Sequence, residues 1–290
     1  MFPGRLHAQG TMFLDAKDRR WIWKGFSDFT LFQRVLDGQN IDALLQERQG
    51  LGVNTLRVFC MYDGGLGRFH PRDYPRYDAQ MQEFINRLGV LGLRMEWVVL
   101  ADCQRVMPDV GEQRAFVEQV VNRCRGWTNC FVSLGNEWPQ NGWNPDDFTK
   151  PTGGGVPLFS FGSNLGDSVP PRLAESDYRE WHGRRDWPKV WQSSDDMVFV
   201  AHGWQEDDHG WHQVALWAPT VHDEPIGFAE VGQDGRRSDD PDLARTLALS
   251  SLAYGAGATF HCDAGVRGEL MGPRQRLCAQ VFFDELRPHG

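Results

Sequence analysis

The nine residues Cys130-Phe131-Val132-Ser133-Leu134-Gly135-Asn136-Glu137-Trp138 decide the fold. An apolar run of strand length ends at a glycine and is followed by an amide, a carboxylate and an indole. This pattern is typical of a buried parallel strand that carries functional groups at its carboxyl end. We therefore expect a strand over 130–136 that presents Asn136 and Glu137 at its end.

Strands and amphipathic helices alternate around this stretch. We expect strands over 21–28, 54–62 and 94–102 and a helix over 41–49. Two further helices are indicated by apolar side chains spaced three and four residues apart, which are Met81, Phe84, Ile85 and Leu88, and then Phe116, Val117, Val120, Val121 and Cys124. Residues 6–20 predict a short β-hairpin that turns at 15–18 and plugs or flanks the fold.

The second half of the chain is less regular. Residues 139–156 are rich in glycine, asparagine and proline and predict a long loop. We expect a helix within 188–203, helices over 240–254 and 272–286, and strands over 157–163, 177–182, 218–224 and 258–263. About eight strands and eight helices in alternation predict a (β/α)8 TIM barrel, formed as a single domain by residues 1–290, with a doubly wound open sheet as the alternative.

The composition narrows the function classes. A net charge of -9 and a pI near 5.5 argue against nucleic acid or an anionic membrane surface as the main partner. Twelve Trp and eighteen Phe are many for this length. Most are expected in the core, but indoles beyond those needed for packing often form flat platforms for sugar rings, so a neutral carbohydrate is the expected partner. No apolar run is long enough to span a bilayer, and residues 1–10 lack the apolar core of a signal peptide, so a soluble, cytoplasmic protein is expected.

The sequence predicts neither a cofactor nor a bound metal. Gly64-Gly65-Leu66-Gly67 lacks the continuation of a dinucleotide loop, and the chain has no P-loop and no G-x-S-x-G motif. Asp207-Asp208-His209 and the neighbouring histidines do not have the spacing of zinc ligands. The six cysteines form no C-x-x-C pair and are expected to be buried free thiols in a reducing compartment.

Function in a (β/α)8 barrel lies at the carboxyl ends of the strands. The polar residues expected there are Arg57, Asp102, Asn136, Glu137, His182, Glu224 or Glu230, and His261. Two carboxyl groups on opposite sides of a glycosidic bond are what its hydrolysis needs, so this set favours a glycosidase.

The chain resembles the clan A (β/α)8 glycoside hydrolases, which include the family 5 cellulases and mannanases. That clan carries its acid/base glutamate after an asparagine at the end of strand four, where this chain has Asn136-Glu137. Its nucleophile ends strand seven, and an arginine lies on strand two, where this chain has Arg57. The resemblance implies a retaining glycosidase. At the end of strand eight, where the clan often has a tryptophan, this chain has His261 and Asp263.

Two glutamates fit the position of the nucleophile. Each follows a proline by five residues, as in the clan: Glu224 follows Pro219, and Glu230 follows Pro225. Strand alternation favours Glu230, whereas Pro225 would end a central strand just after Glu224. We expect Glu224 to be the nucleophile and keep Glu230 as the alternative.

The other site residues have expected roles and simpler alternatives. Asn136 would bind the sugar 2-hydroxyl, while Trp138 and His182 would shape the subsite. Arg57 can equally be explained as the partner of a buried carboxylate. His182 alone could be a surface residue at a helix start, and His261 a hydrogen-bonded core residue.

Two other functions are compatible with the sequence. The first is a barrel that binds carbohydrate through its aromatic residues without turnover. The second is a metal-dependent barrel enzyme that uses Asp102, His182 and His261 as ligands.

Overall fold

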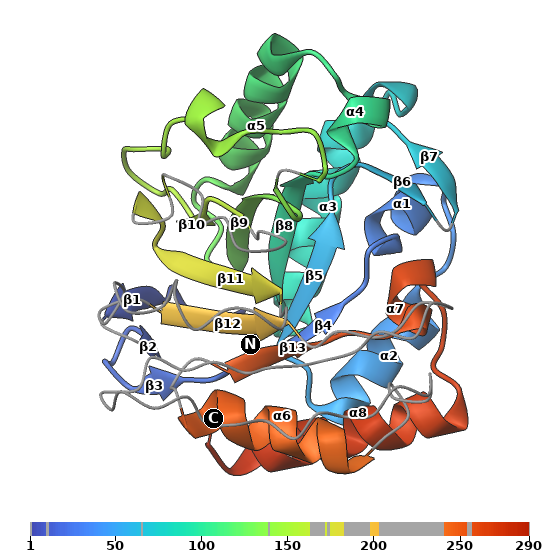
Figure 1. Ribbon diagram of the computed structural model, residues 1–290, viewed down its shortest axis with the longest axis vertical. Helices are drawn as coiled ribbons and strands as arrows, with labels where there is room; N and C mark the ends of the chain where they lie inside the picture. The colour runs from blue at the N-terminus through green and yellow to red at the C-terminus, as the bar shows by residue number, and fades with distance from the viewer. Residues whose placement is uncertain are drawn as a thin grey trace.

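Figure 1 shows the computed structural model of the chain. The structure describes residues 2–9, 12–64, 66–138, 140–162, 172, 175–182, 198–202, 241–253 and 257–289.

Eight parallel strands form one curved sheet. In chain order they are β4 (Trp23–Ser27), β5 (Thr55–Phe59), β8 (Arg94–Leu100), β9 (Cys130–Gly135), β10 (Leu158–Ser160), β11 (Tyr178–His182), β12 (Val198–His202) and β13 (Gly257–Phe260). Their order in the sheet is β10-β9-β8-β5-β4-β13-β12-β11. Each strand thus lies beside the strands that precede and follow it in the chain, and the last strand, β13, pairs with the first, β4.

The remaining seam, between β10 and β11, is closed by hydrogen bonds at the start of β11. The backbone N–H of Asp177 donates to the carbonyl of Phe159 at 2.8 Å. In return, the N–H of Phe159 donates to the Asp177 carboxylate at 2.9 Å. The predicted (β/α)8 barrel is therefore confirmed, and the open doubly wound sheet is not formed.

Helices lie outside the strands (Figure 1). They are α1 (Leu31–Leu36), α2 (Asp42–Leu51), α3 (Tyr77–Val90), α4 (Cys103–Val106), α5 (Val110–Cys124), α6 (Pro241–Ala253), α7 (Asp263–Arg267) and α8 (Pro273–Leu286). The apolar stripes predicted for α3 and α5 are buried against the sheet. Asp109 caps α5 by accepting a hydrogen bond from the N–H of Glu112 at 2.8 Å. The described residues also include three single 3-10 turns: η1 (Pro71–Asp73), η2 (Pro145–Asp147) and η5 (Arg287–His289).

The N-terminal segment forms a three-stranded antiparallel sheet of β1 (His7–Gln9), β2 (Met12–Leu14) and β3 (Arg20–Trp21). The predicted turn at 15–18 is present between β2 and β3. Asp15 accepts a side-chain hydrogen bond from Arg19 there, which is the main reason why the pKa of its carboxyl falls to about 2.

This small sheet plugs the barrel, as predicted. Phe13 of β2 is fully buried, and its ring centroid lies 5.6–6.0 Å from those of Trp23, Phe131 and Tyr178. These three aromatic residues lie at or next to the first residues of β4, β9 and β11. An aromatic cluster therefore fills the end of the barrel that is opposite to the carboxyl ends of the strands.

The structure corrects the position of the seventh barrel strand. It is β12, at residues 198–202 between β11 and β13, and not the strand expected over 218–224. The helix expected within 188–203 is thus not formed at 198–202, and residues 188–197 lie outside the described residues. The run Val198-Phe199-Val200-Ala201 is short and apolar and contains two valines, which is typical of a strand buried on both faces. The strand expected over 218–224 lies outside the described residues. Strand eight ends at Phe260, earlier than predicted, because Asp263 begins α7.

All six cysteines are buried free thiols, as predicted. Burial raises the pKa of Cys103 and of Cys262 to about 12, so both thiols stay protonated at neutral pH. In the parts of the chain that the structure describes, no helix combines the length and apolar character that crossing a membrane requires.

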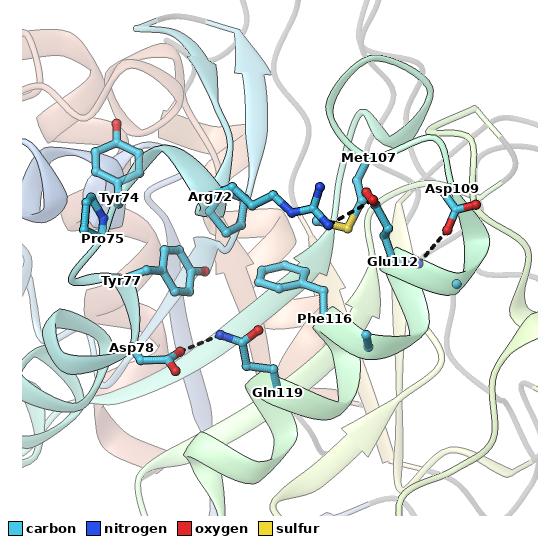
Figure 2. Close-up of a pocket in the computed structure, with 13 residues that line it drawn as sticks. Arg72, Tyr74, Pro75, Tyr77, Asp78, Met107, Asp109, Glu112, Phe116 and Gln119 are labelled. Carbon is cyan, nitrogen blue, oxygen red and sulfur yellow. Dashed lines mark hydrogen bonds and ion pairs between the residues drawn. The ribbon is translucent and has the colours of Figure 1, made fainter.

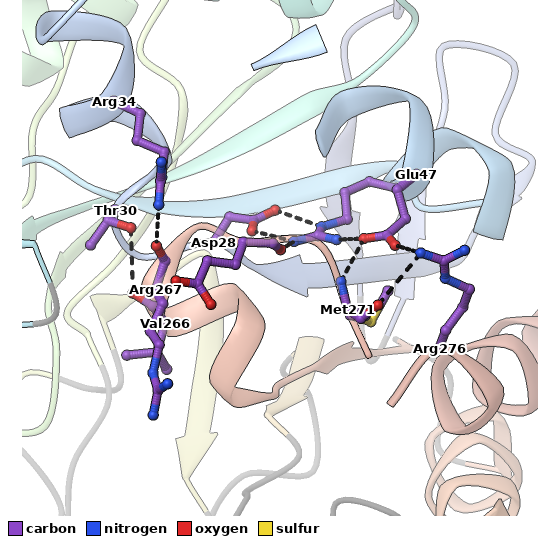
Figure 3. Close-up of polar contacts among 10 residues, drawn as sticks. Asp28, Thr30, Arg34, Glu47, Val266, Arg267, Met271 and Arg276 are labelled. Carbon is purple, nitrogen blue, oxygen red and sulfur yellow. Dashed lines mark hydrogen bonds and ion pairs between the residues drawn. The ribbon is translucent and has the colours of Figure 1, made fainter. Parts of the chain in front are cut away.

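A buried ion pair fixes helix α2 to the end of β4. The Arg48 guanidinium donates to both oxygens of the Asp28 carboxylate, at 2.9 and 3.1 Å, and neither side chain is exposed. Arg48 also donates to the carbonyl of Glu269, and its neighbour Glu47 accepts from Arg276 and from the N–H of Met271 (Figure 3). The loop between α7 and α8 is thereby tied to α2. Burial raises the pKa of Asp28, while the charge of Arg48 opposes that shift.

We expect Arg48→Met to destabilise the protein by about 3–5 kcal/mol, because it leaves the Asp28 carboxylate buried without its partner. Adding Asp28→Asn to that variant should recover much of the loss, since the orphaned charge is then removed. The matched control is Arg245→Met, which breaks exposed pairs with Asp242 and Glu285 and should cost about 1 kcal/mol or less. Urea unfolding measures all three, and equal losses for Arg48→Met and Arg245→Met would contradict the expected role.

Candidate active site

The backbone of Asn136 and Glu137 is held on three sides at the carboxyl end of β9. The N–H of Asn136 donates to the carbonyl of Leu100 at 2.8 Å, and the Asn136 carbonyl accepts from the indole of Trp143 at 2.9 Å. The carbonyl of Glu137 accepts from the N–H of Asn141 at 3.3 Å. A Cβ on the preceding Gly135 would lie 2.7 Å from both the Leu100 carbonyl and the Trp143 ring, so only glycine fits there.

Glu137 has a left-handed backbone, with φ at 45°. For a residue with a Cβ this conformation costs about 1–2 kcal/mol, and such strain is typical of functional positions. Its exposed fraction is only 6%, so the side chain is nearly enclosed. Asp102, at the end of β8, shares the left-handed backbone with φ at 51°.

A buried polar chain runs from Tyr178, whose ring packs against the plug, to Asn136. The hydroxyl of Tyr178 donates to Glu96 Oε1 at 2.8 Å, and Glu96 Oε2 lies 3.3 Å from Arg57 Nε. Arg57 Nη2 in turn donates to Asn136 Oδ1 at 3.0 Å. The structure thus brings Arg57 and Asn136 together and gives Arg57 the buried carboxylate partner of the simpler interpretation. A role of Arg57 in substrate binding stays a prediction.

Sequence analysis missed Glu96 and Tyr178. Glu96 interrupts the apolar run of β8, and strand alternation places it on the same side as Arg57 of the neighbouring strand, with which it is in register. A carboxylate in the middle of a strand that is otherwise apolar was the signal in the sequence that could have identified Glu96 as part of a buried ion pair. Tyr178 lies 82 residues away from Glu96, and nothing local in the sequence links the two.

Asp102 forms hydrogen bonds with the loops next to it. Its carboxylate accepts from the side chain of Arg105 at 2.6 Å and from the backbone N–H of Asp63 at 3.2 Å. Its N–H donates to the side-chain oxygen of Asn141 at 2.9 Å, and Asn141 also holds Glu137. Asp102 therefore anchors α4 and the hairpin of β6 (Tyr62–Gly64) and β7 (Gly67–Phe69) beside the site.

An aromatic group lies across the ends of β4, β5 and β13. The rings of Phe29 and Phe59 stack with centroids 4.1 Å apart, and His261 lies 5.2 Å from Phe29. Tyr62 packs edge-on against both phenylalanines. Burial, and then the charge of Asp102, raises the pKa of Tyr62 to about 12, so the Tyr62 hydroxyl is neutral at neutral pH. Of this group, the sequence predicted only His261.

The remaining predicted residues are described less fully. Trp138 is half-buried and packs against the main core. His182 is the last residue of β11, in register with His202 of β12, and its side chain lies outside the described atoms. Glu224 and Glu230 lie outside the described residues; along the chain they fall between β12 and α6.

Within the described ranges, no group of three or more His, Cys, Asp or Glu side chains converges as metal ligands would. Asp102, which the metal-dependent alternative would use, has its oxygens bonded to Arg105 and Asp63.

A separate hollow of about 530 Å³ lies between the first turns of α3 and α5 (Figure 2). Tyr74, Tyr77 and Phe116 line it, and an ion pair of Arg72 with Glu112 lies beside them. None of the predicted site residues lines this hollow, so it is distinct from the ends of the strands.

No protein-family profile matches the sequence, and no curated protein matches it. Solved structures do. A family 5 glycoside hydrolase from Bacteroides vulgatus has a TM-score of 0.56 at 13% identity, over 89% of this chain and 62% of that one. A β-mannanase from Streptomyces thermolilacinus, solved with mannohexaose, has a TM-score of 0.54 at 15% identity, over 97% and 96%. The β-mannanase of the blue mussel Mytilus edulis has a TM-score of 0.54 at 10% identity, over 99% and 98%. At these identities the likeness shows the fold, which is the barrel of family 5 and related glycoside hydrolases.

Proposed function

We propose that the protein is a retaining glycoside hydrolase that cleaves a β-linked glycoside or oligosaccharide. Glu137 is the acid/base, and Glu224 or Glu230 is the nucleophile. The observation that carries the proposal is the strained, enclosed Glu137 behind Asn136 at the end of the fourth barrel strand, with Arg57 bonded to Asn136. The half-buried rings of Phe29, Tyr62 and Trp138 belong to the same end of the barrel and would form a platform for the sugar.

The proposed reaction is a double displacement. The nucleophilic carboxylate attacks the anomeric carbon while Glu137 gives its proton to the glycosidic oxygen, so the leaving alcohol departs neutral. Glu137, now ionised, takes a proton from water, and the resulting attack on the anomeric carbon releases the sugar and restores both carboxyl groups. Two inversions give net retention of the anomeric configuration.

The paired carboxyl groups set each other's protonation. At the separation of about 5 Å that retaining enzymes use, two carboxylates cannot both ionise cheaply. The buried guanidinium of Arg57 would favour the charged form of the nucleophile, and Glu137 would keep its proton until the bond breaks. Asn136 would bind the 2-hydroxyl of the sugar during this step.

The chain order supports a second carboxylate from residues 203–240. Strand β12 ends at His202, and this connection leads from its carboxyl end to α6. Catalytic groups of (β/α)8 barrels come from such strand-to-helix connections. Both Glu224 and Glu230 belong to it; Glu224 is the first choice and Glu230 the alternative.

A carbohydrate substrate is also supported by the similar structures. The mannanase from Streptomyces thermolilacinus was solved with mannohexaose, and a family 5 enzyme from Prevotella bryantii was solved with a xyloglucan tetradecasaccharide. We therefore place β-linked hexose oligomers first among the substrates to be tried.

The test is a screen of aryl β-glycosides and β-linked oligosaccharides, with proton NMR of the first sugar formed. We expect turnover of at least one substrate, and the β-anomer should appear before mutarotation. Release of the α-anomer first would contradict the double displacement. Binding of the same sugars without turnover would instead favour a non-catalytic carbohydrate-binding barrel.

A further inference from the structure

We infer that Glu96 is a positioning residue, which holds Arg57 and thereby directs the amide of Asn136 at the substrate. The inference rests on the proposed function and extends it to a residue inside the barrel. Glu96 is fully buried in the middle of β8, so it acts through Arg57 and does not touch the sugar.

The chemistry of arginine fixes the orientation of the Asn136 side chain. A guanidinium has only donors, so the atom of Asn136 that meets Arg57 must be the amide oxygen. The amide NH2 is then turned away from Arg57. Asn136 can therefore present donors to a sugar hydroxyl oxygen, and a reversed amide would present an acceptor instead. The position of Arg57 decides between the two.

Arg57 needs a counter-charge to remain in that position. Its exposed fraction is 1%, and a guanidinium without a partner at such depth carries a large desolvation cost. Glu96 supplies the charge, with an Oε2 to Nε distance of 3.3 Å. The Glu96 carboxylate is oriented in turn by the hydroxyl of Tyr178.

Tyr178 makes this chain rigid. Its ring packs against Phe13 of the plug and against Trp23 and Phe131 of the barrel strands, so the hydroxyl that meets Glu96 has a fixed position. A polar chain from Tyr178 through Glu96 and Arg57 to Asn136 thus links the plugged end of the barrel to the proposed catalytic end.

The test uses a glycoside that the wild type hydrolyses and its 2-deoxy analogue. Since Glu96 acts through the contact of Asn136 with the 2-hydroxyl, Glu96→Gln should lower kcat/KM for the parent glycoside by about 100-fold. It should change kcat/KM for the 2-deoxy analogue by no more than about threefold. Tyr178→Phe, which removes one hydroxyl, should give the same selectivity with a loss of about tenfold on the parent substrate.

Tyr77→Phe is the matched control. It also removes a buried tyrosine hydroxyl, one that donates to the carbonyl of Cys60 at 2.9 Å, but it leaves the polar chain intact. It should lower stability as much as Tyr178→Phe does and leave kcat/KM unchanged. If Glu96→Gln does not fold, Tyr178→Phe alone decides.

If Glu96→Gln lowers kcat/KM equally for the two substrates, Glu96 has a general structural role and the inference is overturned. An unchanged kcat/KM in Glu96→Gln would overturn it too. If the wild type hydrolyses no glycoside at all, the proposed function fails, and this inference falls with it. If the wild type is active and the Glu96 and Tyr178 variants have the same kcat/KM as the wild type, this inference is refuted and the proposed function stands.

Discussion

Glu224→Gln or Glu230→Gln, but not both, is expected to abolish glycoside hydrolysis. The variant that removes the nucleophile should lower kcat by about 10⁴-fold or more, because a neutral amide cannot form the glycosyl intermediate. The other variant should keep activity within about tenfold, since a residue that only lines the site contributes binding alone. Initial rates with the best aryl glycoside measure both.

The two variants control for each other. Each makes the same change within the same 203–240 connection, so a difference between them reports catalytic role and not the loss of a charge. Full activity in both variants would remove Glu224 and Glu230 from the mechanism. The second carboxylate would then have to come from another strand end.

Glu137→Gln is expected to lower kcat/KM by about 100- to 10,000-fold, which is the usual contribution of a general acid or base. The loss should be largest for alkyl glycosides and oligosaccharides, whose leaving groups need a proton. It should be smallest for nitrophenyl glycosides, whose leaving groups depart as stable anions. A plot of log(kcat/KM) against leaving-group pKa measures this slope.

Glu118→Gln is the control for that variant. Glu118 is exposed on α5, so its replacement removes the same charge without touching the strand ends. Its plot of log(kcat/KM) against leaving-group pKa should have the same slope as that of the wild type. If Glu137→Gln lowers the rate equally for all leaving groups, the proton transfer assigned to Glu137 would be contradicted.

The fold was predictable from the sequence where apolar periodicity was strong. The alternation of strands with the stripes of α3 and α5 predicted half of the barrel with correct element order. Residues 198–202 were missed because a short apolar run has no periodicity that separates a strand from a buried helix turn. Only its pairing with β11 and β13 identifies it as a strand.

The site was predictable to the extent that it follows from strand ends. The structure places Asn136 and Glu137 directly after β9, as this rule predicted, because parallel strands end at one face of a barrel. Arg57 lies in the middle of β5, yet its side chain reaches Asn136. Glu96 could not be assigned, since a buried charge is explained only by partners that are distant in sequence. The left-handed backbone of Glu137 also could not be predicted, since it accompanies hydrogen bonds from Asn141 and Trp143 of the following loop, which has no regular sequence pattern.

The most direct test is to trap the glycosyl intermediate. A 2-deoxy-2-fluoro glycoside with an activated leaving group slows hydrolysis of the intermediate, so the labelled protein can be digested and the modified residue identified by mass spectrometry. We predict one glycosyl ester per chain, carried by Glu224 or Glu230. An ester on any other residue, or turnover of the reagent without any ester on the protein, would contradict a glutamate partner for Glu137 from this part of the chain.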